Sequence, residues 1–152
     1  MKTILLSFIL LILSFISACQ VASPPPVAAK VDAAFTLAPD QSAAVEGTDL
    51  TITFRSVSGD DRCPSDVECA ASGPVDVLLS VQIGEEESRD FNLQTFTDHK
   101  GIAPSVPFEG LTNPIEVGGY LIRINGVTPY PANPEITIEP SDYRVTLIVS
   151  NP

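Results

Sequence analysis

Residues 75–83 read Val-Asp-Val-Leu-Leu-Ser-Val-Gln-Ile, with an apolar side chain at every second position. Side chains of a β-strand point alternately to opposite faces, so this pattern predicts a strand with one buried face. No window of the chain places apolar residues at the three-four spacing of a helix. The same alternation recurs in four further stretches, residues 50–54, 91–93, 120–124 and 143–149. The sequence therefore predicts an all-β domain.

Turn-forming residues separate the alternating stretches. Gly84 and the three glutamates after it predict a hairpin turn between two strands. Asn125-Gly126, Asn133-Pro134 and the run 139–142 predict further turns. Seven or eight short strands interrupted in this way predict a single antiparallel β-sandwich, with an immunoglobulin-like arrangement as one form of it. The chain has no tryptophan, which the cores of antibody domains contain.

The N-terminus has a different character from the rest of the chain. Lys2 precedes a hydrophobic run, residues 3–18, which is shorter than the ~20 apolar residues of a transmembrane helix. An ordinary secretory signal prefers a small residue where Ile16 stands, three positions before Cys19. Ile16-Ser17-Ala18-Cys19 resembles the lipobox of bacterial lipoproteins, in which the cysteine receives a diacylglyceryl group. Plain secretion is the alternative.

The lipoprotein resemblance implies an organisation for the whole chain. Residues 1–18 would be a signal peptide, and Cys19 would carry the lipid that holds the domain outside the cytoplasm at the bacterial cell envelope. Gln20 is not Asp, which is compatible with outer-membrane delivery in a Gram-negative cell. Residues 19–34 are small and proline-rich, so we expect a flexible tether there, and residues 35–152 would form the domain. A first strand within 19–34 is the alternative, which the consecutive prolines disfavour.

Lipidation of Cys19 would leave two of the three cysteines, Cys63 and Cys69. Disulfides persist in the oxidising compartments that an exported chain reaches, so we expect these two to pair. Closing so short a loop stabilises a fold by about 2 kcal/mol. A zinc site is the alternative, but it needs two more ligands, and His99 is the only histidine.

The cysteine loop carries a second resemblance. Asp61-Arg62-Cys63-Pro64, followed by Cys69 and by Gly73 at the start of a strand, is similar to a motif of uncharacterised bacterial envelope lipoproteins. Many members have an aromatic residue after the second cysteine, where this chain has Ala70-Ala71. The resemblance implies no activity and supports only the fold and the location.

Four carboxylates, those of Asp60, Asp61, Asp66 and Glu68, lie in this loop. Calcium takes six to eight oxygen ligands, so a divalent-cation site is one hypothesis. The spacing differs from the twelve-residue calcium-binding loop, and Arg62 lies among the acids. In the alternative interpretation Asp61 pairs with Arg62 or caps a turn, and the other carboxylates face water.

Composition argues against several classes of function. The formal net charge is −11, which disfavours nucleic-acid binding and leaves the acyl chains as the contact with the membrane. Catalysis by Ser or Cys would need His99 as the base, and neither a nucleophile elbow nor a phosphate-binding loop is present. We therefore expect a protein that is not an enzyme and has no cofactor other than the hypothetical calcium.

Two proline-rich segments are candidate contact loops. Residues 101–114 contain Phe108, and residues 127–131 hold Tyr130 between two prolines. These aromatics would contact an envelope protein, peptide or glycan, or would instead plug the ends of the sandwich. The sequence thus predicts a lipid-anchored, non-catalytic binding or structural module of the cell envelope, with calcium binding as the alternative.

Overall fold

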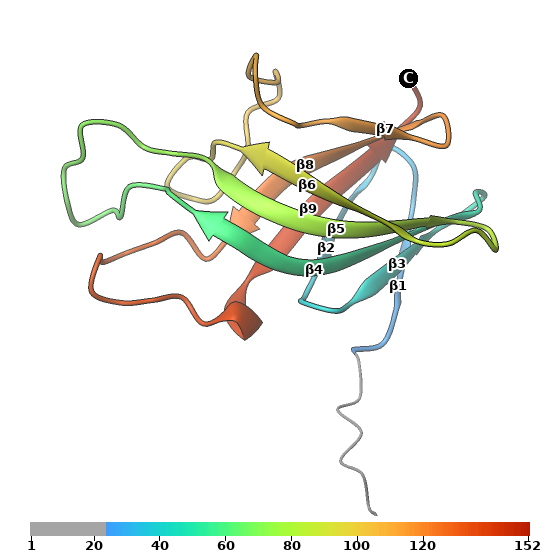
Figure 1. The fold of residues 1–152 in the computed structure, drawn as a ribbon, viewed down its shortest axis with the longest axis horizontal. Coiled ribbons are helices and arrows are strands. Elements are labelled where there is room, and N and C mark those ends of the chain that lie inside the picture. Colours follow the sequence, from blue (N-terminus) through green and yellow to red (C-terminus); the bar gives the residue numbers. More distant parts are fainter. Residues whose placement is uncertain (1–23) are drawn as a thin grey trace, which may run out of the picture.

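The alternating stretches form two packed sheets in the computed structural model, which describes residues 24–152 (Figure 1). The five-stranded sheet has the order β1-β3-β4-β5-β6, and the four-stranded sheet has the order β2-β9-β8-β7. All neighbouring strands are antiparallel except β1 and β3. The predicted all-β sandwich is confirmed. The strands are β1 (Val27–Ala29), β2 (Ala34–Leu37), β3 (Ser42–Val45), β4 (Leu50–Asp60), β5 (Val75–Ile83), β6 (Arg89–Thr95), β7 (Ile115–Val117), β8 (Tyr120–Thr128) and β9 (Arg144–Ser150).

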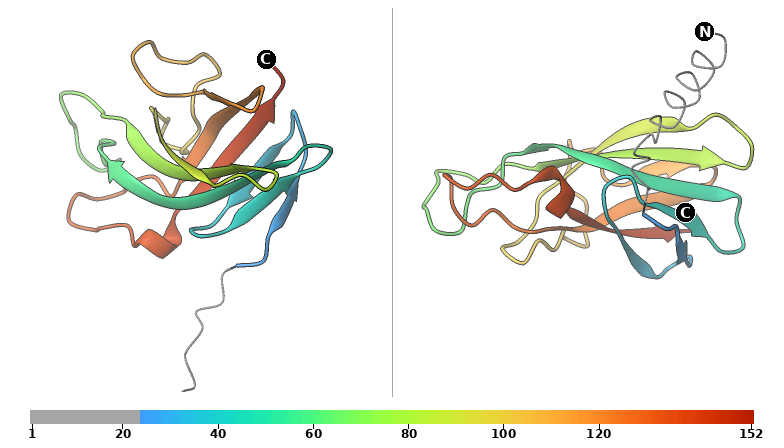
Figure 2. Two further views of the ribbon diagram at one scale, coloured as in Figure 1. Left: turned by 45° about the vertical axis from the view of Figure 1, so that its right-hand side comes forward. Right: turned by 90° about the horizontal axis from the view of Figure 1, so that it is seen from below.

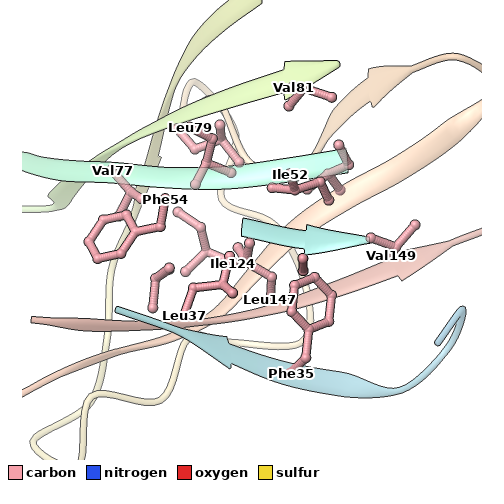
Figure 3. Close-up of a cluster of buried hydrophobic side chains, with 14 of the residues drawn as sticks. Phe35, Leu37, Ile52, Phe54, Val77, Leu79, Val81, Ile124, Leu147 and Val149 are labelled. Atoms are coloured by element: carbon pink, nitrogen blue, oxygen red, sulfur yellow. The ribbon is translucent and has the colours of Figure 1, made fainter. Parts of the chain in front are cut away.

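The core lies between the two layers, which Figure 2 shows from two further directions. Ile52 and Phe54 of β4 and Leu79 of β5 face Ile124 of β8 and Leu147 of β9, and all five side chains are fully buried (Figure 3). Burying one such side chain contributes about 1.5–3 kcal/mol. The alternation predicted for these strands is confirmed, and the core fixes where each strand ends.

β4 is longer than the alternating stretch that predicted it. Its ladder with β5 shifts register twice, between Phe54 and Ser56 and between Val57 and Gly59, and then continues to Asp60. Bulges of this kind bend a strand and re-aim the side chains that follow. The two shifts together preserve the alternation, so Asp60 lies opposite the buried Val75 and on the same face as Phe54.

The N-terminal boundary expected for the domain is wrong. Residues 27–29 form β1, which pairs with β3, and Ala29 is buried. After a short turn the chain enters the other sheet, where β2 pairs with β9. The prolines precede β1, so their missing N–H groups cost the sheet no hydrogen bond. The expected signal peptide and Cys19 lie outside the described residues.

The prediction of a turn at Asn125-Gly126 is also wrong. Both residues lie inside β8, at a register shift in its ladder with β9. A Cβ on Gly126 would lie 2.8 Å from the carbonyl oxygen of Gly101, so glycine permits the close approach of another segment. The pair marks a bulge. The turn expected at Gly84 is confirmed between β5 and β6.

Three long connections leave the same end of the sandwich. The β4–β5 and β8–β9 connections project together at the left of Figure 1. We call this surface the loop end and define it as residues 61–74, 96–114 and 129–143. At the opposite end the strands are joined by the short turns 46–49, 84–88 and 118–119.

We predict that Ala29→Asp lowers the free energy of unfolding by about 1–3 kcal/mol, because a buried carboxylate lacks a partner unless β1 leaves the sheet. Ala28→Asp is the matched control, since Ala28 is exposed in the same strand. Urea unfolding measures both variants. Wild-type stability in both would show that β1 contributes nothing to the fold.

Candidate functional site

A buried ion pair lies at the base of the loop end. Asp60 ends β4, and Arg62 follows two residues later, so both side chains point to one face of the extended chain. The Arg62 side chain is fully buried, and its Nε and Nη2 atoms donate to the two carboxylate oxygens of Asp60 at 2.7 and 2.6 Å. The alternative interpretation, in which Asp61 pairs with Arg62, is wrong, because Asp60 lies on the buried face of β4 opposite Val75 and Asp61 is exposed.

Arg62 also reaches the end of β8 in the opposite sheet. Its Nη1 donates to the carbonyl oxygen of Val127, and its Nη2 donates to that of Pro129, both at 2.9 Å. Its guanidinium carbon lies 5.0 Å from the centre of the Tyr130 ring. Tyr143 lies directly before β9, and its hydroxyl donates to Asp60 at 2.9 Å. One buried guanidinium thus joins the two sheets at this end.

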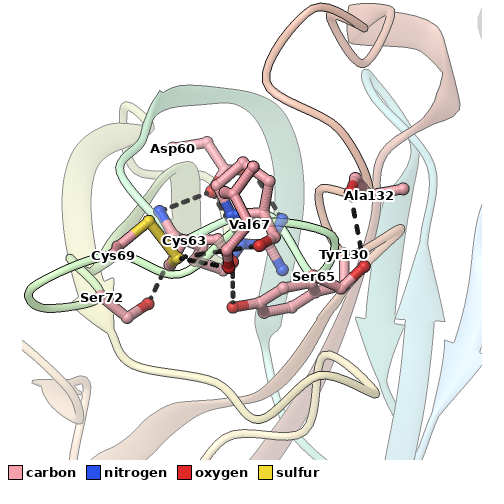
Figure 4. The surroundings of a disulfide bond; sticks show 10 residues. Asp60, Cys63, Ser65, Val67, Cys69, Ser72, Tyr130 and Ala132 are labelled. Atoms are coloured by element: carbon pink, nitrogen blue, oxygen red, sulfur yellow. Dashed lines mark hydrogen bonds and ion pairs between the residues drawn. A yellow bond between two sulfur atoms is a disulfide. The ribbon is translucent and has the colours of Figure 1, made fainter.

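The disulfide loop is fixed against the β8–β9 connection (Figure 4). The expected disulfide between Cys63 and Cys69 is present, which rules out the zinc alternative for these thiols. The hydroxyl of Tyr130 donates to the carbonyl oxygen of Cys63 at 2.7 Å. The backbone N–H groups of Ser65 and Asp66 donate to the carbonyls of Pro131 and Ala132 at 3.0 and 3.1 Å.

The four carboxylates of the cation hypothesis do not converge. Asp60 is occupied by Arg62 and Tyr143, and Asp66 accepts a hydrogen bond from Asn133 at 2.7 Å. Asp61 and Glu68 are exposed. Within residues 24–152, no group of three or more His, Cys, Asp or Glu side chains is placed to hold a metal ion.

The β6–β7 connection, residues 96–114, is held against β8 at both of its ends. Near its start, Asp98 Oδ1 accepts from the N–H groups of Lys100 and Ile102, and Val127 donates its N–H to the carbonyl of Gly101 at 2.8 Å. Near its end, the Asn113 side chain accepts from the N–H of Ile124 at 2.9 Å. Residues 105–110, between these anchors, are exposed.

The two aromatic residues singled out in the sequence have different roles. Tyr130 is half-buried by Arg62 and by the ring of His99, whose centre lies 5.0 Å away, and its hydroxyl is bonded to the disulfide loop. Phe108 packs edge-on against Phe96 and remains half-exposed. Of the two, Phe108 is the one available to a partner.

The exposed large apolar side chains of the described chain all lie on the loop end. Only Phe108 among them was expected from the sequence. The signal for the others is weak: an isolated aliphatic residue among Gly, Pro, Ser or charged residues, outside any alternating stretch. The five side chains, with their exposed fractions, are Val67 (42%), Ile102 (52%), Val106 (75%), Phe108 (51%) and Ile136 (67%).

Hollows of different character lie at the two ends. On the loop end, a groove of about 400 Å³ is lined mainly by the apolar residues Phe96, Ile102, Ala103, Pro104 and Phe108. A second hollow there, of about 240 Å³, has the satisfied Asp60–Arg62 pair among its lining residues. At the opposite end, the short turns enclose a hollow of about 510 Å³ without an exposed large apolar side chain.

Comparison with known protein families, with curated proteins and with solved structures found no match to this chain. Among residues 24–152 no helix is long and apolar enough to cross a membrane. The physical character of the loop end therefore carries the inference of function.

We predict that Arg62→Ala lowers the free energy of unfolding by about 3–5 kcal/mol, because it leaves the Asp60 carboxylate buried without its partner. Arg55→Ala is the control, since Arg55 forms an exposed pair with Asp40 at 3.5 Å and should change stability by under about 1 kcal/mol. Urea unfolding compares the two. Equal losses would show that the buried pair has no special role.

The Tyr143 phenol should make stability depend on pH. Burial, and then its hydrogen bond to Asp60, raise the pKa of Tyr143 to about 12. An unfolded tyrosine ionises near pH 10, so between about pH 10 and 12 the unfolded state loses this proton first and stability falls as pH rises. Tyr143→Phe should show a smaller loss in that window, measured by urea unfolding at about pH 9 and pH 11.5. An unchanged loss would contradict the assignment.

Proposed function

We propose that this chain is a lipid-anchored protein of the bacterial cell envelope and acts as a non-catalytic binding module through its loop end. The observation that carries the proposal is the confinement of the exposed large apolar side chains to this end. Single exposed apolar residues are common on protein surfaces, but their concentration on one surface is typical of an interaction site.

The rigidity of the loop end supports binding. Ordering side chains and loops on association reduces affinity, and a surface that is already ordered avoids most of that loss. Here the disulfide, the buried Arg62 and the hydrogen bonds at the two ends of the β6–β7 connection hold the loops that carry the apolar residues. The contacts of Asp60, Arg62 and His99 are those of a scaffold, so we assign them no catalytic step.

The lipid anchor rests on the lipobox residues Ile16-Ser17-Ala18-Cys19. Because the sandwich begins at Val27, residues 19–26 would separate it from the lipid. Fully extended, that segment spans at most about 28 Å. The domain would therefore stay close to the membrane surface, and its partner would be a protein of the envelope.

The anchor is tested in bacteria that produce the full-length protein and are fed an alkyne analogue of palmitate. We predict that the wild-type chain incorporates the label and that Cys19→Ala abolishes it, because the cysteine thiol is the acceptor. Cys63→Ala with Cys69→Ala is the matched control and should keep the label. Labelling that persists in Cys19→Ala would refute the anchor.

Binding through the loop end is tested separately, with a photo-crosslinking amino acid at position 106 or, as the control, at position 86 of the opposite end. Both positions are exposed. We expect position 106 to give a discrete protein adduct in cells and position 86 to give none. Equal yields at both positions, or no adduct at 106, would contradict the binding role.

A further inference from the structure

We infer that the apolar groove of the β6–β7 connection receives an apolar side chain from a basic protein segment. This inference rests on the proposed function and specifies the chemistry of the partner. The groove is lined mainly by Phe96, Ile102, Ala103, Pro104 and Phe108, and its polar lining residues are Thr97 and Asp98.

The two sides of the groove are held by identifiable contacts. Phe108 is supported from one side by Phe96, with ring centres 4.9 Å apart and an angle of 71° between the rings. Ile102 stands between Gly101 and Ala103, which are both buried and whose backbones bond to β8. Half of the Ile102 surface is exposed, although the backbones of both of its neighbours are held by hydrogen bonds. The exposure of Ile102 is therefore a feature of the folded state.

The size and lining of the groove select the kind of group that fits. About 400 Å³ lies within the range of pockets that take small ligands, and it can hold one or two bulky side chains. A polar group placed there would lose its water and find few partners. The occupant is therefore an apolar side chain. The charges at the rim of the groove select the residues that flank it.

The rim of the groove is acidic, and so is the loop end around it. Asp98 lines the groove and Glu109 follows Phe108, whereas Lys100 and the buried Arg62 are the only lysine and arginine of the loop end. An acidic rim repels anionic lipid, nucleic acid and a second copy of this chain, whose own net charge is −11, and it attracts lysine and arginine. A segment with lysine or arginine beside an aromatic or aliphatic residue matches both the groove and its rim. The acidic residues of the loop end are Asp61, Asp66, Glu68, Asp98, Glu109, Glu135, Glu139 and Asp142.

A random peptide library displayed on phage tests the inference against the full-length protein in detergent. We expect selected peptides to carry an aromatic or branched aliphatic residue flanked by lysine or arginine. Their affinity should fall about tenfold or more with Ile102→Ser or Phe108→Ser, and several-fold when salt is raised, since the charges are exposed. Ala44→Ser, at an exposed position of β3 away from the loop end, is the control and should leave affinity unchanged.

Several outcomes would overturn the inference. Enriched peptides that are acidic, or that bind both groove variants as tightly as wild type, would sink it. The absence of any enriched peptide would also contradict the inference. If position 106 still gives an adduct in cells in that case, the binding role stands while the basic partner is rejected. Binding of Cys19→Ala to anionic vesicles, lost in Phe108→Ser, would identify a membrane as the occupant. Concentration-dependent dimers lost in Phe108→Ser would identify a second copy. Urea unfolding confirms that each serine variant is folded.

Discussion

The burial of one positive charge determines how the loop end is built. A guanidinium carries five N–H donors and cannot be left without partners away from water. Arg62 finds its partners in the Asp60 carboxylate and in two carbonyls, that of Val127 in β8 of the other sheet and that of Pro129 just after β8. Satisfying this charge therefore brings together the ends of β4 and β8, and the disulfide loop and the β8–β9 connection follow. An ion pair of this kind specifies an arrangement more than it adds stability.

The loop end combines a polar interior with apolar residues at its surface, which reverses the usual distribution. The polar contacts are directional, so they hold loops that have no core of their own. The apolar side chains above them are then not needed to hold the loops and are available to a partner. The strands beneath fix the positions at which the loops begin and end, and the hydrophobic core stabilises the strands.

The strands could be predicted because each carries its own alternation, as in residues 75–83. Features that depend on distant segments could not. β1 is three residues long and is defined by its pairing with β3, and Asn125-Gly126 forms a bulge because Gly101 approaches it. The cysteine loop was predicted in part: the disulfide followed from cysteine pairing, whereas the partner of Arg62 was missed, although Asp60 has the same place in the alternation as Ile52 and Phe54. The lipid anchor at Cys19 stays a prediction.

The N-terminal strands also determine how the domain would respond to mechanical load. A pull on the chain ahead of Val27 reaches β1 first, and β1 is a short edge strand held to one neighbour, β3. Its release would free residues 27–31, up to the hydrogen bond from the Asp32 N–H to the carbonyl of Val149, and lengthen the chain by at most about 18 Å. β2 would remain paired with β9 in the other sheet, so the core would stay closed. The sandwich thus has an extensible first element that can yield under tension before the loop end is disturbed.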